Sequence, residues 1–77
     1  MNLTRQLEHA VTQFDRMQEH VHRINPKRYY NQYALGIYLR RVDDVVQAVN
    51  KGANLKDTLS LAYNGALLSF LLKHFKL

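Results

Sequence analysis

The 77-residue chain contains no cysteine and no tryptophan, and it has one proline, three glycines and six acidic residues against eleven lysines and arginines. Without cysteine, no disulfide can cross-link the fold and no thiolate can bind zinc. Three isolated glycines do not make a phosphate-binding loop, which needs closely spaced glycines. The lack of cysteine is typical of the reducing cytoplasm, and we therefore expect a cytoplasmic protein.

The chain also lacks a long hydrophobic run. Its longest uncharged stretch, residues 58–72, contains a threonine, an asparagine and two serines, whereas a membrane-spanning helix needs about 20 mainly apolar residues. The first residues have no apolar core of the kind that a secretory signal peptide requires. We expect one soluble domain over residues 1–77, because this length supports a single core.

Apolar residues recur at alternating steps of three and four along residues 3–24. This heptad spacing predicts one helix whose apolar stripe packs against other helices. The positions beside the stripe carry no permanent charge, which favours a bundle helix over a partner-specific zipper. On the outer face, Glu19 and Arg23 are spaced for an ion pair. The stripe consists of Leu3, Leu7, Ala10, Phe14, Met17, Val21 and Ile24.

The pair Asn25-Pro26 is the first break in the helical pattern. Proline excludes the helical conformation for the residue before it, so the first helix ends there. A second helix is expected over residues 26–50, starting at Pro26, with Asn31 as an alternative start. Gly52 supplies the left-handed conformation that ends this helix.

Asn54 begins the third predicted helix, residues 54–76, as an N-cap with Asp57 three residues later. Short connections favour antiparallel neighbours, so the predicted fold is all-α, a three-helix antiparallel bundle. A chain of this length either folds alone or self-associates, and the sequence favours neither. The predicted core consists of Leu7, Phe14, Met17, Val21, Leu35, Tyr38, Val42, Val45, Val49, Leu59, Ala62, Ala66 and Phe70.

Lysine, arginine and tyrosine are concentrated in residues 27–41, which hold four of the five tyrosines. Tyrosine and arginine dominate the hot spots of protein interfaces, and the same residue types bind phosphates and stack on bases. A third interpretation is structural, with Tyr33 and Tyr38 packed in the core and Arg40 and Arg41 solvated. The candidate partner-binding residues are Lys27, Arg28, Tyr29, Tyr30, Tyr33, Arg40 and Arg41.

No residue pattern indicates catalysis or metal binding. Asp43 and Asp44 would point about 100° apart on a helix and could not share a proton, and Asp44 is spaced to pair with Arg40. His20 and His22 are two residues apart, whereas a zinc-binding pair on a helix is four apart. We therefore expect no catalytic residue, no metal and no cofactor, and hence no enzyme.

A family resemblance lies in Tyr29-Tyr30-Asn31-Gln32-Tyr33-Ala34-Leu35-Gly36-Ile37-Tyr38-Leu39, followed by Val42-Asp43 and Lys51-Gly52. These residues resemble short uncharacterised accessory proteins of bacterial plasmids and prophages, over roughly residues 29–72. The chain departs from that pattern at Gln32, where the family has proline. The resemblance implies a mobile-element context, in which small proteins often bind a host protein, for example as inhibitors of a defence system.

We expect a non-catalytic interaction protein that binds a protein partner. The alternative is a small basic nucleic-acid-binding protein, because a net charge of +5 attracts phosphates. A role for residues 54–76 at a membrane surface is a third and weaker option, and an enzyme is the least supported class. The phosphate contacts in the alternative would come from Lys27, Arg28, Arg40, Arg41 and Lys51.

Overall fold

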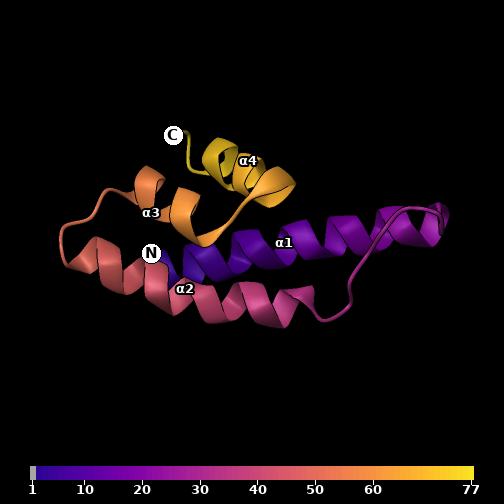
Figure 1. The fold of residues 1–77 in the computed structure, drawn as a ribbon, viewed down its shortest axis with the longest axis horizontal. Helices are drawn as coiled ribbons and strands as arrows, with labels where there is room; N and C mark the ends of the chain where they lie inside the picture. Colours follow the sequence, from indigo (N-terminus) through magenta and orange to yellow (C-terminus); the bar gives the residue numbers. More distant parts are fainter. Residues whose placement is uncertain (1) are drawn as a thin grey trace.

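The computed structural model describes residues 2–77, which form four α-helices and no strand. These are α1 (Leu3–Ile24), α2 (Ala34–Asn50), α3 (Leu55–Ala62) and α4 (Gly65–His74). α1 and α2 run side by side in opposite directions, and α3 and α4 lie together on one side of this pair (Figure 1). α3 packs against α2, whereas α4 packs against α1. The all-α prediction is confirmed, but the predicted count of three helices is wrong.

Asparagine side chains cap the starts of α1 and α3. The Oδ1 atom of Asn2 accepts a hydrogen bond from the Arg5 amide at 2.8 Å. Likewise, the Oδ1 atom of Asn54 accepts one from the Asp57 amide at 3.2 Å. Each bond satisfies an amide that has no partner inside its own helix, and such a cap contributes about 1 kcal/mol. The predicted cap at Asn54 is confirmed.

Proline and glycine lie just beyond the ends of the first two helices. α1 ends at Ile24, directly before Asn25 and Pro26. α2 ends at Asn50, and Gly52 follows with a φ of +104°, a conformation that strains residues other than glycine. Both predicted stops are therefore confirmed.

The start of α2 lies at Ala34, so the predicted starts at Pro26 and Asn31 are wrong. Residues 25–33 form turns and irregular backbone in place of helix. The Oδ1 atom of Asn31 accepts from the Tyr33 amide at 2.9 Å, and its carbonyl oxygen accepts from the Ala34 amide at 3.0 Å. An asparagine side chain that binds a nearby amide competes with helical hydrogen bonds, which delays the helix.

The predicted continuous helix over residues 54–76 is wrong, because the helix is interrupted at Tyr63 and Asn64, between α3 and α4. Tyr63 and Asn64 are extended, with φ of −130° and −143°, and Gly65 has a φ of +61°. This segment is apolar around much of its circumference, and a straight helix buries only one side against a single neighbour. The break places one half on α2 and the other on α1, so that both halves bury apolar side chains.

The core lies where the four helices meet. Its buried apolar residues are Leu7, Ala10, Val11, Phe14, Val42, Val45, Leu59, Tyr63, Leu67 and Leu71. Other predicted core residues are only half-buried: Val21, Leu35, Tyr38, Val49, Ala62 and Phe70. On α1 the core also includes Val11, which lies beside the heptad seam. On α4 it includes Leu67 and Leu71, which the predicted core omitted.

Two predicted core residues, Met17 and Ala66, are exposed, and the Met17 side chain is 52% exposed. The rings of Phe14 and Phe70 lie 5.5 Å apart, where α4 packs on α1. Beyond this contact, the C-terminal part of α1 extends past the other helices (Figure 1). The apolar seam therefore continues past the core that covers its first half.

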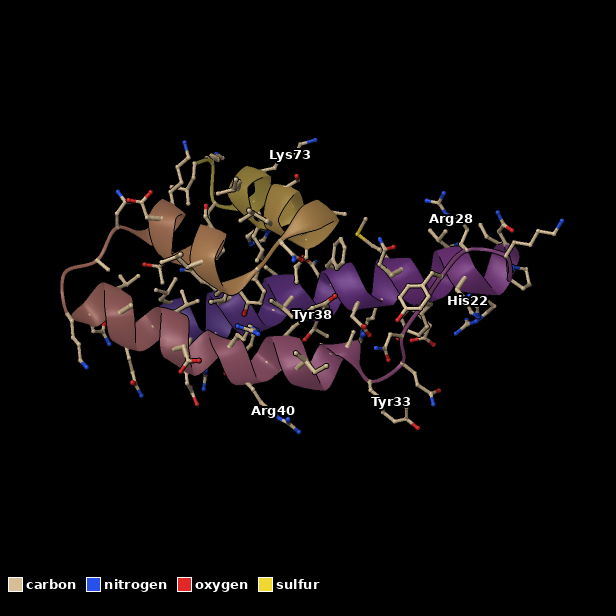
Figure 2. The ribbon with its side chains drawn as sticks, in the orientation of Figure 1. His22, Arg28, Tyr33, Tyr38, Arg40 and Lys73 are labelled. Carbon is tan, nitrogen blue, oxygen red and sulfur yellow. The ribbon has the colours of Figure 1, made fainter. Side chains whose placement is uncertain are left out.

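The ion pair expected between Glu19 and Arg23 is confirmed, with 2.8 Å between Oε1 and Nη2. It is the only ion pair within residues 2–77, so the pair expected between Arg40 and Asp44 is wrong. The Arg40 side chain extends away from the bundle (Figure 2). Because Glu19 and Arg23 are themselves solvent-exposed, their pair contributes about 0.5 kcal/mol or less.

Tyr63 ties the break between α3 and α4 to α2. Its side chain is 4% exposed, and its hydroxyl donates to the Tyr38 carbonyl oxygen at 2.8 Å. The two tyrosine rings meet edge to face, with centroids 6.2 Å apart. Burial raises the pKa of Tyr63 to about 12; the Arg41 guanidinium opposes this change, and the Asp44 carboxylate adds to it. The folded state therefore favours the protonated, neutral phenol of Tyr63.

We expect the stability contributed by neutral Tyr63 to be lost as pH rises from about 10, the value for the unfolded chain, to about 12. In this range the unfolded chain releases the proton more easily, which favours unfolding by roughly 2 kcal/mol. Tyr63→Phe cannot ionise and loses only one hydrogen bond, worth about 1 kcal/mol. The native protein should therefore have the higher free energy of unfolding at neutral pH, and its difference from the variant should become smaller at alkaline pH. Urea unfolding followed by circular dichroism measures this difference. A difference in unfolding free energy between the native protein and Tyr63→Phe that stays constant with pH would contradict this expectation.

Candidate partner-binding surface

The loop of residues 25–33 is anchored to α1 by two hydrogen bonds. It runs back along the C-terminal part of α1 before it reaches α2 (Figure 1). The Tyr30 hydroxyl donates to Asp15 Oδ2 at 3.1 Å, and His22 Nδ1 lies 2.7 Å from the Arg28 carbonyl oxygen. A carbonyl oxygen only accepts, so His22 carries a proton on Nδ1. The Tyr30 and His22 rings also pack, with centroids 5.8 Å apart.

Asp15 explains why the loop follows this path. It is a carboxylate in α1 with only 6% of its surface exposed, and a buried charge needs a hydrogen-bond donor. Partial burial raises the pKa of Tyr30, and the hydrogen bond to Asp15 and the negative charges of Asp15 and Glu19 raise it further. The Tyr30 hydroxyl therefore stays protonated and able to donate. Asp15 follows buried Val11 by four residues, a spacing that places it on the packed side of the helix.

The clustered tyrosines divide into two structural groups. Tyr29 is 86% exposed and Tyr33 is 73% exposed, and Figure 2 shows Tyr33 pointing away from the bundle. The interpretation that placed Tyr33 in the core is therefore wrong. Tyr30 and Tyr38 are half-buried, and each makes the internal contacts described above. Of these four side chains, Tyr29 and Tyr33 are thus the two that remain available to a partner.

A hollow of about 240 Å³ lies beside the anchored loop. Tyr29 and Tyr30 line it from the loop, and Phe14, Asp15 and Tyr38 line it from α1 and α2. The start of α4 closes a further side. Aromatic rings around a small concave site can accept an inserted side chain, so Tyr29 borders a shaped surface as well as solvent.

The cations proposed to contact phosphate do not form one patch. Lys27 and Arg28 are exposed on the loop, whereas Arg40 and Arg41 are exposed on α2. Arg28 and Arg40 extend from different sides of the molecule (Figure 2). Lys51 follows α2, at the opposite end of the molecule from the loop (Figure 1). Of the seven candidate residues, the structure gathers the two cations and three tyrosines of residues 27–33 on one loop.

A second exposed apolar site, absent from the prediction, lies between α2 and α3. Leu61 is 89% exposed and Ile37 is 45% exposed. Both line a groove of about 390 Å³ that also includes Arg41 and Tyr63. Leu61 belongs to the segment that is apolar on nearly all sides, so its sequence pattern could not separate it from the buried leucines around it.

Across residues 2–77, no group of three or more histidine, aspartate and glutamate side chains is arranged to hold a metal ion. No helix in the same range combines the length and the apolar character needed to cross a membrane. No protein-family model, no curated protein and no solved structure matches the chain.

We expect Tyr30→Phe to lower the free energy of unfolding by about 1–3 kcal/mol, because it leaves the Asp15 carboxylate without its donor. Tyr29→Phe removes a hydroxyl from an exposed ring and serves as the matched control, with no measurable change. Adding Asp15→Asn to Tyr30→Phe should recover part of the loss, since the buried charge is gone. Urea unfolding gives the free energy of unfolding of each of these variants. Equal stability of the two tyrosine variants would show that the anchor carries no energy.

Proposed function

We propose that the protein is a non-catalytic interaction module that binds a protein partner through the loop of residues 25–33. The observation that carries this proposal is the 86% exposure of Tyr29 next to Tyr30, which is anchored to Asp15. Large rings exposed to water are a common feature of binding surfaces, and tyrosine is enriched among interface hot spots.

Anchoring the loop favours binding because it lowers the conformational entropy that a partner would otherwise have to remove. The bonds at Tyr30 and His22 hold the backbone on both sides of Tyr29. The ring of Tyr29 is therefore presented on a defined backbone. Lys27 and Arg28 are exposed on the same loop, so we expect the partner surface around the tyrosine to be acidic.

The distribution of cations supports a protein partner ahead of nucleic acid. A site that tracks a phosphate backbone uses a continuous positive groove. Here the exposed cations lie at opposite ends and on different sides of the molecule (Figures 1 and 2). Only Lys27 and Arg28 accompany the exposed aromatic rings of the loop.

The resemblance of residues 29–39 to accessory proteins of plasmids and prophages suggests the biological setting. In that setting the partner would be a host protein. Binding would cover a surface of that host protein and so inhibit it. The host protein could, for example, belong to a defence system. This part of the proposal rests on analogy between small proteins of mobile elements.

We expect the tagged protein to retain a stoichiometric protein partner from nuclease-treated bacterial lysate, as read by mass spectrometry. Tyr29→Ala and Tyr33→Ala together should reduce recovery more than about tenfold, as expected for hot-spot residues. Leu61→Ala is the control, because it removes a large exposed apolar side chain from a different surface. The circular dichroism spectra of both variants should match that of the native protein, which would show that the helices are retained. Equal recovery with the tyrosine variant and the control would contradict the proposed surface.

A nucleic-acid-binding function is the second candidate, because Lys27 and Arg28 directly precede Tyr29, whose exposed ring could stack on a base. It predicts that nuclease abolishes recovery. It also predicts that a labelled oligonucleotide binds with an affinity that falls steeply as salt rises. Lys27→Ala should then reduce the salt dependence by about one phosphate contact, whereas Lys51→Ala, at the far end, should not.

A further inference from the structure

A groove with basic and aromatic walls lies at the other end of α1 from the loop. It has a volume of about 610 Å³, within the range of small-molecule sites. Its walls come from the first turns of α1 and from the end of α4, which lie together although they are far apart in sequence. The residues that line it are Arg5, Gln6, His9, His74 and Phe75.

The polar side chains of this groove suit an anion. Arg5 and His9 are four residues apart and so lie on one face of α1, and His74 faces the groove from α4. No carboxylate lines the groove. Within residues 2–77, no protein acceptor binds the Arg5 guanidinium or either imidazole. Arg5, His9 and His74 thus line one open groove, and each carries N–H groups that no acceptor within residues 2–77 occupies.

Aromatic packing orients one of these donors and forms an apolar wall. The His74 ring stacks on Phe70, with centroids 6.1 Å apart and an interplanar angle of 25°. Phe75 meets the His74 ring edge to face at 5.0 Å. Because Phe75 also lines the groove, a flat apolar group can lie beside the donors. The site thus combines oriented N–H groups with an aromatic surface.

We infer that this groove binds a small phosphomonoester that carries a planar aromatic body, of the nucleoside monophosphate class. Arg5 can bind two phosphate oxygens at once, since a guanidinium matches that geometry. His9 and His74 donate further hydrogen bonds, and the aromatic body packs against Phe75. A phosphomonoester presents three terminal oxygens to these three side chains, whereas a carboxylate presents only two. This site is independent of the partner-binding loop.

Histidine NMR tests the inference on the complete chain, with adenosine monophosphate as the probe at constant ionic strength. The four histidines provide an internal control, because His20 and His22 lie on α1 but do not line the groove. The probe should shift the imidazole signals of His9 and His74 in a saturable way. His20 and His22 should not move. Parallel shifts of all four, or no shift up to about 10 mM, beyond millimolar affinity, would overturn the inference.

Variants and related probes separate the two parts of the site. Arg5→Ala should weaken binding about tenfold, the effect of losing one charge-assisted contact. Arg16→Ala removes an exposed arginine from the same helix outside the groove and should bind as the native protein does. Adenosine should bind far more weakly, whereas inorganic phosphate should shift the same two histidines at higher concentration. Equal binding of adenosine and adenosine monophosphate, or equal loss in both arginine variants, would contradict the phosphate site.

Discussion

The apolar stripe of α1 is the constraint on which the rest of the fold depends. No single neighbour covers it: α2 and α4 both pack on α1, and α3 fills the angle between α2 and α4. To supply two of these helices from residues 54–76, the chain has to break and change direction. The helix is interrupted at Tyr63 and Asn64, and α4 begins at Gly65, whose positive φ is accessible to glycine at little cost. Tyr63 fixes the interruption against α2 through the hydrogen bond that its hydroxyl donates to the Tyr38 carbonyl oxygen.

A buried charge on the same helix organises the loop. Asp15 lies at the edge of the core, where α1 begins to leave the bundle, and its carboxylate takes the Tyr30 hydroxyl as a donor. That bond draws the middle of the loop against α1. Tyr29 lies next to this anchor and Tyr33 lies at the end of the loop, and both stay in solvent. The surface proposed to bind a partner thus follows from the need to satisfy one carboxylate.

The proposed partner surface and the anion groove use opposite ends of α1. The helix has 22 residues, which corresponds to about 30 Å along its axis. Aromatic side chains define the first site, whereas arginine and histidine define the second. The net charge of +5 is therefore divided among separate small sites. The two proposed sites share no lining residue, so occupation of one would leave the residues of the other accessible.

Local signals in the sequence determined the helical class, the bounds of α1, the stops at Pro26 and Gly52 and the cap at Asn54. The stops and the cap depend on residues within about one helical turn, and the helical class depends on a pattern within one continuous segment, so the chain carries this information locally. The sequence also located the cluster of tyrosines and cations. Only the tertiary structure decided which of its members are exposed, where α2 starts and where residues 54–76 break. Those outcomes depend on contacts such as Tyr30 with Asp15 and Tyr63 with Tyr38, which join residues 15 and 25 positions apart. The spacing of apolar residues identifies the apolar face of each helix separately, whereas burial of that face depends on which other helix packs against it.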